Sequence, residues 1–383
     1  MKPGVEKRPQ FWQVGTAANL QRQTDGGTRD TGWAQAPAKG DIVSKQIGTF
    51  VFAVAVGLIG TAAARAQTKV LDTVKQRGTL SCGVHVGLAG FGQPDDKGNW
   101  TGLDVDYCRA IAAAVLGDDK RVKYVPTTAK ERFTALQSGE IDVLVRSTTW
   151  TIARDSSLGL SFAGVNYYDG QGFMVKKSLG IKSARELNGA TVCVLTGTTT
   201  ELNLSDYFKS NNLTYKPVVF EKLDEAVQAY QSGRCDVYTT DQSALYSVRV
   251  QQAKPEEHVV LPEIISKEPL GPSVRQGDSQ WFTVVRWVHF ALLNAEELGI
   301  TQANADQMLT SNNPEIKRLL GKEGDFGKGI GLDNDWAMKI IKAVGNYGEI
   351  FDRNVGVGSR LKIDRGQNNL WSKGGLHYGP PVR

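Results

Sequence analysis

Short apolar segments alternate with amphipathic ones along most of the chain. Thr79–Val86, Val122–Pro126, Thr191–Leu195 and Pro217–Phe220 are rich in β-branched or aromatic residues, which predicts strands. Leu103–Leu116 instead carries apolar residues at helical spacing. Because strands that alternate with helices usually build parallel sheets, we expect an α/β fold whose mainly parallel sheets are flanked by helices.

One helix–turn–strand pattern occurs twice, 94 residues apart. Ala135–Val143 and Ala229–Val237 both contain Gln-Ser-Gly, in which the glycine ends a predicted helix. A short strand follows in each copy, at Ile141–Val145 and at Cys235–Thr239. The spacing is far too long for a solenoid repeat. We interpret the pair as two similar α/β lobes, although chance similarity of a common loop would give the same pattern.

Two segments, Tyr167–Lys176 and Leu270–Arg275, are placed to cross between such lobes. They would form a hinge of two crossover strands. We therefore expect one lobe at residues 67–170 plus 272–383 and the other at residues 171–271.

The N-terminal region has the layout of an export signal. The apolar run Gly48–Gly60 precedes Ala64-Arg65-Ala66, in which small residues occupy the −3 and −1 positions of a cleavage site. The run is short for a membrane-spanning anchor, which is the alternative. We predict a signal peptide at residues 41–66. Residues 1–40 lack periodicity and are expected to be a disordered or untranslated extension.

Charge and residue types argue against several classes of function. After residue 66 the chain has 37 basic and 36 acidic residues, so a nucleic-acid partner is not expected. Its four histidines are scattered without the spacing of metal ligands. It contains neither a dinucleotide fingerprint nor a nucleophile elbow. We expect no metal, no cofactor and no enzymatic activity.

Polar groups follow three predicted strands, and ligands of open α/β sheets bind beyond the carboxyl ends of strands. Arg154 ends a hydroxyl-rich loop, and its planar guanidinium matches a carboxylate. Thr199 lies in a turn that opens a helix, where free N–H groups favour an anion. Asp241 ends a strand and could accept an ammonium group, or it could cap a helix at Gln242–Val250. Each feature alone is equally typical of an ordinary loop or cap, but together they complement a zwitterion.

Six longer stretches carry a family resemblance. They are Gly98–Cys108, Ala129–Val143, Tyr168–Met174, Gly197–Leu204, Leu261–Pro272 and Gly345–Phe351. The chain resembles the type II periplasmic solute-binding proteins for polar amino acids, and more closely the general L-amino acid-binding components of ABC importers. This resemblance implies a two-lobed, Venus flytrap fold and a monomer in the periplasm. It also implies capture of free L-amino acids with broad specificity, for delivery to ABC-transporter permease subunits in the inner membrane.

The resemblance assigns roles to matching residues. Ser147 and Thr149 would contact the main-chain groups of the ligand. Arg154 and Thr199 would bind its carboxylate, and Asp241 would bind its ammonium group.

The first loop departs from the family pattern. His85–Phe91 is small and apolar, with Phe91 as one wall of the ligand pocket, and Trp150 could form another. This loop predicts a roomy pocket that tolerates many side chains. Arg146 could serve acidic ligands, or it could form a buried structural pairing.

The four cysteines allow three pairings. The predicted topology favours Cys193 with Cys235 on neighbouring strands, and Cys82 with Cys108 between the first strand and the first helix. Export makes disulfides possible, and buried free thiols are the alternative.

Two rival functions use the same fold. One is an enzyme that resembles the cyclohexadienyl or arogenate dehydratases, which would require a general acid beside the ligand. The other is an extracellular sensor domain, which normally continues into a membrane-spanning and cytoplasmic module, and none follows Arg383.

Overall fold

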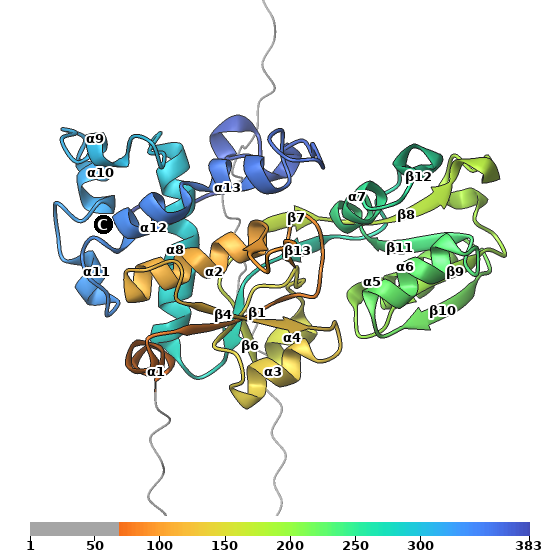
Figure 1. Ribbon diagram of the computed structural model, residues 1–383, viewed down its shortest axis with the longest axis horizontal. Helices are drawn as coiled ribbons and strands as arrows, with labels where there is room; N and C mark the ends of the chain where they lie inside the picture. Colours follow the sequence, from red (N-terminus) through yellow and green to blue (C-terminus); the bar gives the residue numbers. More distant parts are fainter. Residues whose placement is uncertain (1–68) are drawn as a thin grey trace, which may run out of the picture. The chain divides into compact units, whose positions relative to one another are not determined.

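The computed structural model describes residues 69–383 (Figure 1). The predicted extension at residues 1–40 and the predicted signal peptide at residues 41–66 lie outside the described residues. Within residues 69–383, no helix is both long enough and apolar enough to cross a membrane.

The described chain forms two five-stranded sheets. The first has the order β4-β1-β5-β14-β6, in which β1 pairs in parallel with β4 and β5, while β14 is antiparallel to β5 and β6. Its strands are β1 (Leu80–His85), β4 (Val122–Thr127), β5 (Val143–Leu144), β6 (Leu160–Phe162) and β14 (Ser273–Arg275). The return of the chain through β14 makes this sheet mixed rather than purely parallel.

The second sheet has the order β10-β9-β11-β8-β12. Strand β9 is parallel to β10 and β11, whereas β8 is antiparallel to β11 and β12. Its strands are β8 (Gln171–Lys176), β9 (Thr191–Leu195), β10 (Lys216–Phe220), β11 (Val237–Asp241) and β12 (His258–Val260). Each sheet is therefore the centre of one lobe, with parallel strands on one side and antiparallel pairings toward the opposite edge.

Two short strands connect the lobes. Strands β7 (Tyr167–Asp169) and β13 (Glu268–Leu270) form an antiparallel pair of their own and lie side by side between the two sheets (Figure 1). The first leads into β8, and the second leads toward β14. The expected hinge of two crossover strands is thus present. The predicted lobe limits at residues 170–171 and 271–272 remain a prediction.

Helices cover both sheets. In the first lobe, α2 (Leu103–Leu116), α8 (Ser279–Glu297) and α12 (Trp336–Val344) pack against one another. In the second, α5 (Thr199–Ser210), α6 (Leu223–Gln231) and α7 (Gln242–Val250) pack against its strands. The other helices and strands are α1 (Val70–Arg77), β2 (Gln93–Pro94), β3 (Trp100–Thr101), α3 (Arg132–Ser138), α4 (Ile152–Ser156), α9 (Ala305–Met308), α10 (Pro314–Leu319), α11 (Phe326–Gly329) and α13 (Tyr347–Asn354), besides short 3-10 turns.

Helix α2 begins where two segments of backbone come very close. Gly102 precedes it with a φ of 133°, and a Cβ there would lie 2.1 Å from the carbonyl oxygen of Phe91. Only glycine fits this conformation and this approach. The helix is buried on nearly all sides, because it is covered by β1, α8 and α12 together.

Both expected disulfides are present. Cys82 in β1 is bonded to Cys108 in α2, with Cα atoms 6.1 Å apart. Cys193 in β9 is bonded to Cys235, which lies two residues before β11, with Cα atoms 5.6 Å apart. The free-thiol alternative is wrong. Each lobe thus has one covalent link between elements that are distant in sequence.

We predict that the double substitution Cys193→Ser, Cys235→Ser lowers the free energy of unfolding by about 4 kcal/mol, because the bond closes a loop of 42 residues in the unfolded chain. Denaturant titration of wild type and variant, both without reductant, measures the difference. Equal midpoints would contradict the pairing.

Candidate functional site

A small cavity lies between the lobes at the carboxyl ends of β1, β5, β9 and β11. Its volume is about 40 Å³. It is lined by His85, Leu88, Ala129, Arg132, Arg146, Ser147, Thr149, Leu195, Thr198, Thr199, Thr200, Thr240, Asp241 and Ala244. Both lobes contribute to this lining, as expected for a ligand site in open α/β sheets. We call it the inner cavity.

Asp241 is the acid of the inner cavity. Its carboxylate accepts no hydrogen bond from any residue between 69 and 383, and it does not cap α7. Desolvation, with Asp169 and Glu268 nearby, raises its pKa well above the ordinary value, while Arg132 and Arg154 oppose that shift. A partly buried carboxylate without a donor is costly, so Asp241 is well placed to receive a cation.

Two buried arginines also line the inner cavity. The side chain of Arg146 donates from Nε to the carbonyl of Thr127 at 2.9 Å, and it makes no ion pair with the described residues. Arg132 donates from Nη1 to the hydroxyl of Thr148 at 3.5 Å, and its Nε has no partner among the described residues. Burial lowers the pKa of Arg146 to about 10 and also lowers that of Arg132. Both guanidinium groups retain capacity to bind an anion.

Arg146 was predicted from the sequence as a possible contact of acidic ligands, whereas Arg132 was not predicted as a site residue. The expected alternative for Arg146, a buried structural pairing, is present in part: its Nε bonds to the carbonyl of Thr127, while it makes no ion pair with the described residues. Arg132 lies in α3, where its sequence position resembles that of any solvated helical residue. Only the packing of α3 against the first sheet turns its side chain into a buried one.

The N-terminus of α5 forms another part of the lining. The hydroxyl of Thr198 caps the helix by accepting from the amide of Glu201 at 3.1 Å. The amides of Thr199 and Thr200 lie in the first turn, where an α-helix supplies no carbonyl partner. These N–H groups and the helix dipole favour negative charge at this point.

Glu268 joins the two lobes beside the inner cavity. Its Oε2 accepts from the hydroxyl of Thr149 at 2.6 Å and from that of Thr199 at 2.8 Å. Its Oε1 accepts from the side-chain amide of Asn203 and from the hydroxyl of Ser266, both at 2.7 Å. Thr149 belongs to the first lobe, whereas Thr199 and Asn203 belong to the second. This carboxylate is 1% exposed and is the polar centre of the interlobe contact.

Arg154 lies behind Thr149 rather than in the lining of the inner cavity. Its Nη1 donates to the carbonyl of Thr149 at 2.5 Å, and its guanidinium is 5.1 Å from the ring centroid of Phe133. Burial lowers its pKa, and the nearby charges of Glu268 and Asp241 oppose that shift. In this structure Arg154 therefore supports the loop that carries Thr149.

The remaining predicted residues have different positions. Ser147 lines the inner cavity with a left-handed φ of 38°, and it donates from its amide and hydroxyl to Asp104 at 2.9 and 3.1 Å. Phe91 is buried against Tyr167 and does not line the cavity. Trp150 is 40% exposed, stacks on Phe162 and does not line it either.

A larger hollow adjoins the inner cavity. Its volume is about 590 Å³, and it shares Ala129, Arg146 and Leu195 with the inner cavity. The rest of its lining is Val86, Gly87, Thr128, Glu221, Lys222, Leu223, Asp224, Val227, Gln228, Gln231 and Gln251. We call it the outer chamber. It too is lined from both lobes.

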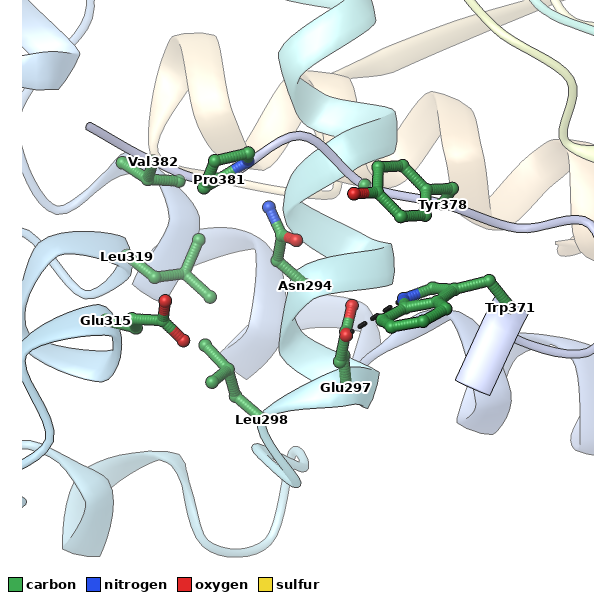
Figure 2. Close-up of a pocket in the computed structure, with 10 residues that line it drawn as sticks. Asn294, Glu297, Leu298, Glu315, Leu319, Trp371, Tyr378, Pro381 and Val382 are labelled. Atoms are coloured by element: carbon green, nitrogen blue, oxygen red, sulfur yellow. Dashed lines mark hydrogen bonds between the residues drawn. The ribbon is translucent and has the colours of Figure 1, made fainter. Parts of the chain in front are cut away.

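A third hollow lies at the C-terminal tail, within the first lobe (Figure 2). Its volume is about 210 Å³, and Glu297 of α8, Trp371 and Tyr378 project toward it. Trp371 donates to Glu297 at 3.0 Å. No lysine or arginine of the described chain lines this hollow. It therefore offers no cationic partner for a carboxylate.

Comparison with known proteins places this geometry in a family. The model of the bacterial extracellular solute-binding proteins, family 3, matches residues 80–318. The chain belongs to this family.

Several relatives of this family 3 protein have names that state a ligand. The general L-amino acid-binding periplasmic protein AapJ of Rhizobium johnstonii is 63% identical over 347 residues, which cover 90% of this chain and 100% of AapJ. The glutamate/glutamine/aspartate/asparagine-binding protein BztA of Rhodobacter capsulatus is 56% identical over 329 residues, covering 86% of this chain and 97% of BztA. Neither name denotes an enzyme.

A solved structure supports the fold. The ABC-transporter periplasmic binding protein of Brucella ovis, with glutathione bound, is 64% identical and has a TM-score of 0.81, over 82% of this chain and 99% of that chain. This family 3 protein thus has the two-lobed type II periplasmic binding protein fold that its sequence indicates.

A buried carboxyl beside the site makes the stability of the protein depend on pH. Desolvation raises the pKa of Asp104 to about 6, although hydrogen bonds from Ser147 and Asn166 oppose the shift. The pKa of Asp104 is higher in the folded state than in the unfolded state, so the protonated carboxyl favours folding. This contribution to the free energy of unfolding is fully present below about pH 4 and is lost as the pH rises through about 6.

We predict that Asp104→Asn, which cannot ionise, gains stability relative to wild type between pH 4 and pH 7, by on the order of 1–3 kcal/mol. Denaturant titrations at several pH values measure this difference. The exposed Asp96→Asn is the control, and its difference from wild type should not follow the same course. A pH-independent difference for Asp104→Asn would contradict the prediction.

Proposed function

We propose that this family 3 protein captures free L-amino acids of many kinds in the periplasm and delivers them to the permease of an ABC transporter. The observation that carries the proposal is an unpartnered acid, Asp241, which shares one interlobe cavity of the described chain with the unpaired guanidinium groups of Arg132 and Arg146. An amino acid supplies both missing charges in one small molecule. The names of AapJ and BztA support the same ligand class.

In the proposed complex, Asp241 accepts the ammonium group of the ligand. The carboxylate lies at the N-terminus of α5, beside Thr199, where helix amides and the nearby guanidinium groups stabilise it. Ser147 and Thr149 complete the contacts to the main-chain groups, and Arg154 holds the Thr149 loop in place. These roles use groups from both lobes, so a bound ligand connects them.

We infer that the lobes move when the ligand binds. The inner cavity is small and lined from both lobes, so the ligand would enter an open form. The lobes then close around β7 and β13. Contacts made only in the closed form shift the population toward it. We further propose that the permease recognises this closed form and that the binding protein acts as a monomer exported through residues 41–66.

A thermal-shift screen with each L- and D-amino acid tests the function. A ligand that binds only the folded state raises the melting temperature. We expect increases for many L-amino acids and none for their D-enantiomers. No increase with any amino acid would contradict the proposal, and turnover of prephenate or arogenate by the purified protein would instead favour the dehydratase alternative.

Asp241→Asn is expected to weaken binding of every L-amino acid at least tenfold, because a charge-assisted bond contributes about 1.5–3 kcal/mol. Arg154→Ala is expected to do the same through the loss of the Thr149 support. Titration calorimetry measures both affinities. The exposed Asp96→Asn serves as the control, and wild-type affinity in the Asp241 variant would contradict the assigned role.

The affinity should also depend on pH. The free protein holds the pKa of Asp241 above its ordinary value, whereas a bound ammonium group would lower it. Binding therefore releases a proton from Asp241, and wild-type affinity should rise with pH until Asp241 is ionised in the free protein. Calorimetry between pH 5 and pH 8 measures this rise, which Asp241→Asn should remove. An equally steep rise in the variant would contradict the assignment.

A further inference from the structure

The outer chamber has no role in binding the main-chain groups of an amino acid, yet it connects with the place where they would bind. The two hollows share the side chain of Arg146. This residue is 5% exposed, and only its Nε donates to a protein acceptor among residues 69–383. A ligand that extends from the inner cavity past Arg146 would therefore meet an unpaired cation at the boundary.

The lining of the outer chamber suits a polar, peptide-like group. Gln228 and Gln231 of α6, with Gln251 after α7, supply side-chain amides that both donate and accept. Lys222 supplies a second cation, whose side chain is 62% exposed and lies 3.6 Å from the carboxylate of Glu225. Glu221 and Asp224 add two carboxylates to the lining, and Glu221 is paired with Lys130. Val86 and Val227 add apolar surface between these groups. Amides, a terminal carboxylate and short aliphatic parts would each find a matching group here.

The rim of the outer chamber is held by contacts that can open. Lys130 of the first lobe pairs with Glu221 of the second at 2.6 Å, and both side chains are more than 60% exposed. Gln251 also donates to Gln93 across the lobes at 3.3 Å. Exposed contacts of this kind contribute little to stability. An extended ligand could therefore be admitted without large loss of interlobe stabilisation.

We propose that the outer chamber is a second subsite, and that the ligands of this protein include γ-glutamyl peptides. The inference rests on the proposed function, because it keeps the free amino-acid head at Asp241 and α5. An ordinary α-linked peptide blocks either the ammonium or the carboxylate of that head. A γ-glutamyl peptide leaves both groups free and carries its extension on the side chain, so the extension enters the outer chamber past Arg146.

One comparison supports this ligand class independently of the cavity. The related binding protein of Brucella ovis, which is 64% identical, contains bound glutathione. Glutathione is a γ-glutamyl tripeptide whose extension carries two amide bonds, a thiol and a terminal carboxylate. The amides and the carboxylate are the groups for which Gln228, Gln231 and Lys222 offer partners.

Titration calorimetry with four compounds tests the proposal: L-glutamine, γ-L-glutamylglycine, reduced glutathione and α-L-glutamylglycine. We expect the first three to bind and the α-linked isomer to bind at least tenfold more weakly than the γ-linked one. If L-glutamine binds while both γ-glutamyl peptides do not, the second subsite is overturned and the proposed function stands. If no free amino acid binds, the proposed function itself fails.

A pair of tryptophan substitutions on helices of the second lobe locates the extension. Gln228 of α6 lines the outer chamber, whereas Asp206 is exposed on α5 and does not line it. Gln228→Trp should fill the chamber and lower the ratio of the affinity for glutathione to that for L-alanine at least tenfold. Asp206→Trp should leave the ratio at its wild-type value. An unchanged ratio in Gln228→Trp, with both variants folded by circular dichroism, would overturn the placement.

Discussion

Burying a carboxylate without a hydrogen-bond donor destabilises a folded protein, because the charge loses its hydration and gains no partner in return. Within the described chain Asp241 is partly buried without such a donor, and the two buried guanidinium groups in the same cavity make no ion pair. The charges are held apart rather than paired, since Arg132 and Asp241 come from different lobes. A ligand that carries both complementary charges offsets the desolvation cost of the Asp241 carboxylate and of the guanidinium groups at the same time. This explains why a protein would keep such an arrangement, and why its closed form should depend on the ligand.

Glu268 limits how the ligand can bind. Its carboxylate already accepts the hydroxyl groups of Thr149 and Thr199, so a second carboxylate at the same hydroxyls would face a like charge. The amides at the start of α5 and the side chain of Arg132 are the groups not engaged by Glu268. The ligand carboxylate is therefore better accommodated at helix N–H groups than at the threonine hydroxyls. Glu268 meanwhile keeps both threonines in fixed orientations.

The local parts of this architecture were predictable from sequence, and the long-range parts were not. Helical spacing located α2 at Leu103–Leu116, and the apolar run at Thr191–Leu195 located β9, because both elements are determined by residues close in the chain. The antiparallel strands β8 and β14 depend on where a returning segment joins the sheet, which no local pattern encodes. Glu268 was missed for the same reason: its partners on other elements lie 65 to 119 residues away. Phe91 was expected in the pocket wall but packs on Tyr167, since sequence position does not determine the side of the loop to which a ring turns.

The first loop explains how one fold can combine strict recognition of the amino-acid head with tolerance of the ligand's side chain. Val86 and Gly87 from this loop line the outer chamber, and a Cβ at Gly87 would meet no atom within 4 Å. A large side chain in this loop would reach into that space and select one ligand by contact. The small residues leave the space open instead, and its glutamine amides can donate to or accept from many kinds of group. Specificity for the charged head and its chirality would then reside in the inner cavity, while the outer chamber offers partners to an extension and limits its size.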